Sequence, residues 1–262
     1  MTSRQLTSMQ LTSVHPTSVT PTAGDARVTS LAELWHRVTG TQTAPSRNIV
    51  IVVAVVAFLL VALPRVWRIS RNAITIAHEG GHAVVALATG RRLAGVSLHS
   101  DTSGVTVSYG KPRGLGMVLT SAAGYVTPSL LGLGGAYLLT SNHITGLLWA
   151  VILLLAAILI MIRNVYGLLS VIIAGAAVFA VSWFASSQLQ AVFAYLVVSF
   201  LLLAGVKPVA ELSRRRVKGR GGDSDADQLA RLTRLPAALW VAFFFLVALG
   251  CLAVGGRWLL HL

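Results

Sequence analysis

The sequence predicts an α-helical polytopic membrane protein with about six to seven transmembrane helices and a small β-hairpin. Three observations predict this fold class. Hydrophobic residues make up 55% of the 262 residues, charged residues make up 11%, and the mean hydropathy is +0.75, which is too apolar for a soluble domain of this length. Several long runs carry no formal charge, against a requirement of roughly 20 apolar residues for each transmembrane helix. Apolar and polar residues alternate between positions 93 and 110, which predicts the hairpin.

The first segment, residues 1–47, differs in composition from the rest of the chain. Thr, Ser, Pro and Gln dominate it, with near-repeats such as QLTSMQLTSVHPTSVTPT. It lacks the apolar core, roughly 7–15 residues long, of a signal peptide. Because this composition cannot bury a core, we expect a disordered tail followed by a membrane domain at 48–262.

The membrane domain contains apolar runs that predict its spans in chain order. These runs are residues 49–63, 114–162, 164–206 and 235–256. The second and third runs are long enough for two spans each, so the runs together give six spans. The apolar segment 73–90 adds a further helix that could span the bilayer or re-enter it.

The basic residues indicate the orientation of the chain in the membrane. Of the 21 Lys and Arg residues, eight fall in the segment 207–234, which is typical of a cytoplasmic loop. The net charge of +13 therefore does not indicate nucleic acid as a partner, and anionic lipid headgroups are the more natural one. Counting spans back from this segment places residues 91–113 and Arg163 on the cytoplasmic side as well.

Three arginines disagree with this orientation: Arg65, Arg68 and Arg71. They would lie outside if segment 73–90 crosses the bilayer completely. Either that segment re-enters on the same side or the positive-inside rule is locally broken, and the sequence leaves both possibilities open.

The segment AITIAHEGGHAVVALATG, residues 73–90, places ionisable groups inside an apolar helix. His78 and His82 are four residues apart, so both imidazoles lie on one helix face and can bind one metal ion. Glu79 is offset around the helix, as suits a general base next to a zinc-bound water. Ionisable residues within a span are costly and indicate function, although the three could instead pair with neighbouring helices. The pattern predicts two ligands of a zinc site and its catalytic glutamate.

The segment LAGVSLHSDTSGVTVSYG, residues 93–110, predicts a hairpin around a polar turn. A protease binds its substrate in extended form, and an open strand edge can hold a peptide by adding it to the sheet. We therefore predict substrate binding along the second strand, at Val105, Val107 and Tyr109. His99 and Asp101 lie near the turn, where polar residues are more often structural than metal ligands.

Together these stretches resemble a known family, the site-2 proteases, which are intramembrane zinc metallopeptidases of the M50 group, and in particular its M50B-like branch. The stretches that carry the resemblance are AHEGGHAVVALATG, the hairpin, SAAGYVTPSLLGLGGAYLL, RNVYG and SDADQLARLTRLP, within residues 48–260. The family implies hydrolysis of a peptide bond in or near the bilayer. It also implies a third zinc ligand, usually the aspartate of an Asp-Gly pair, and this chain contains no such pair.

The third ligand must therefore come from elsewhere in the chain. The resemblance favours Asp225, in a Ser-Asp-Ala box, with Asp227 as second choice. Asn164 in RNVYG lies where the usual ligand helix is expected, but an amide oxygen is a poorer zinc ligand than a carboxylate. An alternative for residues 223–227 is helix capping, since Ser and acidic residues stabilise a helix N-terminus.

The prediction from the sequence is a zinc-dependent intramembrane endopeptidase in the cell membrane that cleaves membrane-protein or peptide substrates within a lipid bilayer. The cofactor is Zn²⁺, held by His78, His82 and Asp225, with Glu79 as the base. Two alternatives remain: a divalent-metal transporter, which would need more liganding residues along several spans, and a catalytically inactive relative that only binds membrane proteins. The oligomeric state and the substrate are left open.

Overall fold

The computed structural model describes residues 32, 35, 38–219 and 222–260, and most of the tail predicted at 1–47 lies outside them. The elements within this part of the chain are α2 (Arg47–Ala62), α3 (Pro64–Ala88), β1 (Arg92–Leu98), β2 (Gly104–Tyr109), α4 (Leu115–Thr140), α5 (Ile144–Met161), α6 (Val165–Phe184), α7 (Ser187–Val217), α8 (Asp225–Thr233) and α9 (Ala237–Leu260). The prediction of a helical protein with one small hairpin after the motif helix is thereby confirmed.

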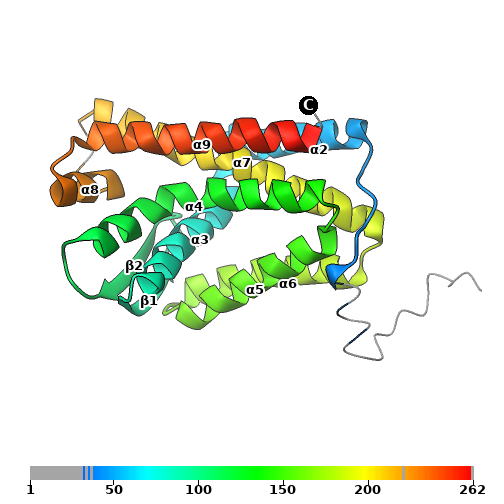
Figure 1. Ribbon diagram of the computed structural model, residues 1–262, viewed down its shortest axis with the longest axis horizontal. Coiled ribbons are helices and arrows are strands. Elements are labelled where there is room, and N and C mark those ends of the chain that lie inside the picture. The colour runs from blue at the N-terminus through cyan, green and yellow to red at the C-terminus, as the bar shows by residue number, and fades with distance from the viewer. Residues whose placement is uncertain (1–31, 33–34, 36–37, 220–221, 261–262) are drawn as a thin grey trace, which may run out of the picture.

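The long helices form a bundle in which α4, α7 and α9 lie next to one another, while α5 and α6 form a second layer (Figure 1). Among the described residues, five helices are long and apolar enough to cross a membrane, namely α4, α5, α6, α7 and α9. The pair α2 and α3 would add a sixth span if it is counted as one broken span. The protein is thus a multi-pass membrane protein, and its span count reaches the lower end of the predicted six to seven only with the bent pair.

Helices α2 and α3 meet at an angle of 99°. Leu63 is extended at the bend, and Pro64 begins α3, where its missing N–H removes no helical hydrogen bond. Near its start, α3 contacts α7 through an ion pair of 3.4 Å between Arg71 and Glu211. At its end, Thr89 packs against Gly116 in the first turn of α4. Helix α3 thus runs obliquely from α7 to the hairpin end of the bundle (Figure 1).

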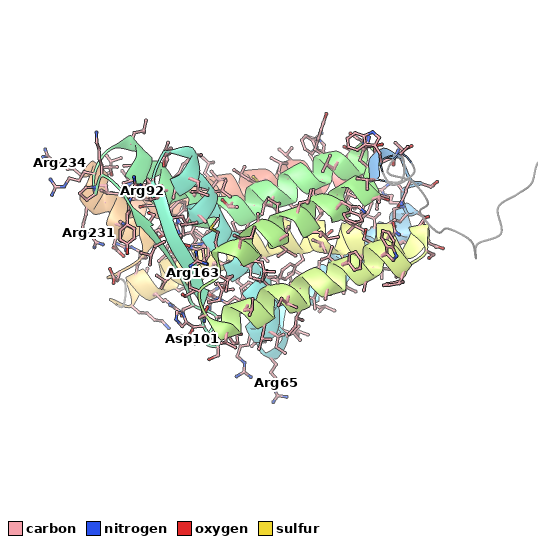
Figure 2. All side chains as sticks on the ribbon, turned by 90° about the horizontal axis from the view of Figure 1, so that it is seen from below. Arg65, Arg92, Asp101, Arg163, Arg231 and Arg234 are labelled. Carbon is pink, nitrogen blue, oxygen red and sulfur yellow. The ribbon has the colours of Figure 1, made fainter. Side chains whose placement is uncertain are left out.

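Two of the three arginines that disagreed with the predicted orientation lie near the basic segment. Arg68 and Arg71 line one cavity together with Arg215 of the basic segment. Figure 2 shows Arg92, Arg163, Arg231 and Arg234 at the same end of the bundle as the hairpin. Arg68 and Arg71 are therefore close to Arg215, whereas Arg65 projects from the underside of the bundle, away from Arg231 and Arg234 (Figure 2). The bent pair α2–α3 is compatible with a broken span and with a re-entrant segment.

Small residues allow α4 to approach its neighbours closely. A Cβ at Gly132 would come within 3.0 Å of Leu202, and one at Gly135 within 2.6 Å of Val198, both on α7. Gly81 of α3 similarly faces Thr127 of α4. Because helix association in a membrane depends on close packing of small residues, this composition places α4 at the centre, in contact with α3, α7 and α9.

The two strands pair antiparallel, and the two edges of the hairpin differ. The outer edge of β1 is covered by the link between α5 and α6, where Arg163 donates its backbone N–H to the Val96 carbonyl at 2.9 Å. Beside it, the amide of Asn164 bonds both the N–H and the carbonyl of Leu98. The sheet contains two strands, so β2 forms its other edge.

Candidate metal centre

His78, His82 and Asp225 converge on one point between α3 and the start of α8. The Nε2 atoms of the two histidines lie 3.2 Å apart. Oδ2 of Asp225 lies 3.2 Å from His78 Nε2 and 3.3 Å from His82 Nε2. The two imidazoles are on adjacent turns of α3, whereas the carboxylate reaches them from a segment more than 140 residues later in the chain. The fold thus brings three potential ligand atoms into a nearly equilateral triangle.

The spacing of this triangle fits a zinc ion. In a tetrahedral site with zinc–ligand bonds of about 2.0–2.1 Å, neighbouring ligand atoms lie about 3.3 Å apart. The three distances here, 3.2, 3.2 and 3.3 Å, are close to that value. Two imidazole nitrogens and one carboxylate oxygen are also a donor set typical of catalytic zinc, which leaves a fourth position for water or substrate.

A second contact orients His82 for metal binding. Its Nδ1 lies 2.7 Å from the backbone carbonyl of Thr120 in α4. A carbonyl can only accept, so Nδ1 carries the proton and Nε2 presents its lone pair toward the triangle. Metal-bound histidines usually have such an outer hydrogen bond, which fixes the ring and its tautomer.

Gly124 of α4 lies directly against the two imidazoles. A Cβ at this position would come within 2.4 Å of His82 Nε2 and 2.6 Å of His78 Nε2. No real side chain tolerates such contacts, so only glycine fits here without displacing a histidine. The ring of His78 also packs edge-on against Tyr125, with 4.8 Å between ring centroids.

The two aspartates Asp225 and Asp227, in the acidic segment before α9, make different contacts. Asp225 is the first residue of α8 and faces the histidines. Asp227 instead accepts hydrogen bonds from the N–H and the hydroxyl of Ser224, at 3.2 and 2.6 Å, and forms an ion pair with Arg216. The capping alternative thus describes Asp227, and Asp225 is free to face the triangle.

Glu79 is buried beside the triangle, with 4% of its surface exposed. Its Oε2 accepts a hydrogen bond of 2.7 Å from the hydroxyl of Thr106 on β2. Gly104, on the same strand, lets the backbone come close, because a Cβ there would lie 2.5 Å from Glu79 Cγ. The hairpin therefore packs directly on the glutamate of the motif.

A cavity of about 570 Å³ connects these groups with the surface. Its lining includes His78, Glu79, His82 and Asp225, and also Arg215 and Asp223 at the basic end of the bundle. The side chain of Asp223 is fully exposed, so the cavity opens there. Water can reach the triangle from this end although the surrounding helices are apolar.

The remaining predicted site residues lie elsewhere. Asn164, the alternative ligand, uses its amide to pair with the backbone of Leu98. Asp101 accepts two hydrogen bonds from Ser103, which lower its pKa and stabilise the turn, and His99 bonds within the same turn. The three residues proposed to bind substrate, Val105, Val107 and Tyr109, are about half exposed or more on the outward face of β2, and Val105 also lines the cavity.

Three contributors to the site were missed by reasoning from the sequence: Thr106, the carbonyl of Thr120, and Gly124. The alternation that predicted β2 also puts Thr106 opposite the valines, so its inward direction could have been inferred. The approach of α4 at Gly124 could only be guessed from the small-residue run, because the residues that face one another depend on helix packing.

The family model described as Peptidase M50B-like matches residues 51–255. No curated protein and no solved structure gives a significant match.

Proposed function

Because this chain belongs to the Peptidase M50B-like family, we propose that it is a zinc-dependent intramembrane endopeptidase that cleaves membrane-protein substrates. One observation carries the proposal beyond the family: His78, His82 and Asp225 form a triangle with the spacing of a zinc site, beside a buried Glu79 and on a cavity that reaches the surface. The protein is a multi-pass membrane protein, and we propose the cell membrane as its location.

His78, His82 and Asp225 would hold the metal, and the carboxylate would offset part of its charge. When bound, zinc lowers the pKa of a water ligand toward about 7 and polarises the carbonyl of the substrate. The hydrogen bond to Thr120 keeps His82 in the tautomer that binds metal. Asp227 and Asn164 would not join this set, because their polar atoms are used in other contacts.

Glu79 would act as the general base and then as the general acid. Its carboxylate takes the proton of the attacking water, and the same group delivers that proton to the leaving amine of the peptide. Burial among apolar helices strengthens these charge interactions, because the local dielectric constant is low. The cavity supplies the water that the bilayer core lacks.

The outer edge of β2 would hold the substrate. A peptide added to this edge would run in extended form past Val105, whose side chain lines the cavity. Val107 and Tyr109 continue the same outward apolar face and would contact substrate side chains. The other edge of the hairpin is covered by Ile162, Arg163 and Asn164, so β2 offers the accessible backbone.

The proposal is tested by measuring cleavage and metal content together. Wild-type protein and the Glu79→Gln variant are purified and analysed for zinc. Each is then reconstituted into proteoliposomes together with membrane proteins that were extracted in detergent. New N-termini are then identified by mass spectrometry. We expect about one zinc per chain in both proteins and new N-termini with the wild type alone.

The alternatives predict other results. A catalytically inactive relative would give zinc without new N-termini, and a divalent-metal transporter would give zinc flux across the proteoliposome membrane without cleavage. Equal cleavage by wild type and Glu79→Gln would remove Glu79 from the mechanism.

A further inference from the structure

Thr106 contacts the glutamate of the motif from the inward face of β2. Its hydroxyl lies 2.7 Å from Oε2 of Glu79 and 3.2 Å from the backbone carbonyl of the same residue. The single hydroxyl proton is directed to the closer acceptor, the carboxylate. We propose that Thr106 is a positioning residue, which holds the Glu79 carboxylate in the orientation needed for proton transfer. This inference rests on the proposed function of Glu79.

The geometry explains why the carboxylate needs such a partner. Glu79 has three rotatable side-chain bonds, and it lies in a cavity lined by polar groups that could attract it to other orientations. Thr106 binds one carboxylate oxygen, and within the described chain no hydrogen bond is made to the other, Oε1. One oxygen is therefore held by the protein while the other remains available for the water proton.

The strand that carries Thr106 is also the strand proposed to bind substrate. Side chains alternate along β2, so Thr106 points inward while Val105 and Val107 point outward. Gly104 keeps the strand close enough for the hydroxyl to reach Glu79. A peptide paired with β2 would fix the position of this strand and, through Thr106, that of the base. The contact thus links substrate binding to the alignment of the catalytic group.

The test compares Thr106→Val with Thr106→Ser. Valine keeps the branched shape and removes the hydroxyl, whereas serine keeps the hydroxyl. Thr140→Val is the matched control, because it removes a threonine hydroxyl at the far end of α4, where that group bonds the carbonyl of Tyr137. The probe is a synthetic transmembrane peptide that contains a cleavage site identified among the new N-termini. The measurements are kcat, KM, zinc content and thermal stability.

We expect Thr106→Val to lower kcat about 10- to 100-fold, because misplacement of a catalytic group by about 1 Å can have an effect of this size. KM and zinc content should stay within about twofold of wild type, since neither the outward face of β2 nor the metal ligands change. Thr106→Ser should restore most of the activity, and Thr140→Val should retain all of it.

Three results would overturn the inference: a wild-type kcat in Thr106→Val, a Thr106→Ser variant as slow as the valine variant, or a loss confined to KM or to zinc content. If Thr106→Val does not fold, Thr106→Ala takes its place in the comparison with serine. An inactive Glu79→Gln together with a fully active Thr106→Val would reject the positioning role alone. Cleavage by Glu79→Gln would instead reject the proposed function itself.

Discussion

Replacement of Gly124 by alanine tests the arrangement of the proposed metal centre without changing a ligand. The new Cβ would lie 2.4 Å from His82 Nε2 and 2.6 Å from both Cε1 and Nε2 of His78. Ordinary contacts to a Cβ begin near 3.4 Å, so each imidazole would have to move by about 1 Å. Zinc–ligand distances tolerate deviations of only about 0.2 Å. The two histidines could not both keep their positions in the triangle.

A minimum can be given for the loss of zinc affinity in Gly124→Ala. Removing an outer-shell partner of a metal ligand typically lowers metal affinity about 10- to 100-fold. Displacing two ligands should cost more, so we expect a loss of at least about 100-fold, which corresponds to about 2.7 kcal/mol. Cleavage should fall in parallel, since the proposed mechanism requires the metal.

The assay is competition for zinc between the purified protein and a chelator of known affinity, with zinc measured by mass spectrometry. Gly134→Ala is the matched control, because it makes the same substitution in the same helix where a new Cβ meets nothing within 4 Å. This control should bind zinc normally and be stabilised by up to about 1 kcal/mol, the helix preference of alanine over glycine. Wild-type zinc affinity in Gly124→Ala would refute the view that α4 closes directly on the metal site.

Further variants test the other parts of the site. Glu79→Gln should abolish cleavage and leave zinc bound, because it removes the base and keeps the ligands, and proteolysis with zinc measurement checks this. Asp225→Ala should lower zinc content and activity together. Asp227→Ala should affect zinc less and should lower the free energy of unfolding by about 1 kcal/mol, because a capping contact of α8 is lost. A larger loss of zinc in Asp227→Ala than in Asp225→Ala would exchange the roles of the two residues. Tyr109→Pro should weaken binding of the transmembrane peptide while zinc stays bound, since it disturbs the edge strand, and equal loss of zinc would make the hairpin a structural support of the metal site.

The features predicted from the sequence were those set by local spacing. The four-residue separation of His78 and His82 fixes both on one helix face whatever surrounds them, and the alternation at 104–109 defines which side chains of β2 face outward. Apolar runs likewise predicted α4, α5, α6, α7 and α9, since the length of a span follows from the thickness of the bilayer, whereas the run 49–63 forms α2, which counts toward a span only together with α3. Each of these inferences needs only neighbouring residues in the chain.

Features that depend on packing between distant segments could not be predicted in this way. Asp225 and Asp227 are two residues apart in the same box, and only the approach of α8 to α3 determines that the first faces the histidines while the second caps the helix. The 99° bend between α2 and α3 was not predicted, and near it Arg71 pairs with Glu211 of α7, about 140 residues later in the chain.

The central claim is that His78, His82 and Asp225 together bind one zinc ion. X-ray absorption spectroscopy at the zinc edge, on purified protein of known zinc content, tests it most directly. We predict one zinc per chain, two imidazole nitrogens and oxygen ligands at about 2.0–2.2 Å in the wild type, with zinc lost in His78→Ala and strongly reduced in Asp225→Ala. An unchanged spectrum and stoichiometry in both variants would contradict the account.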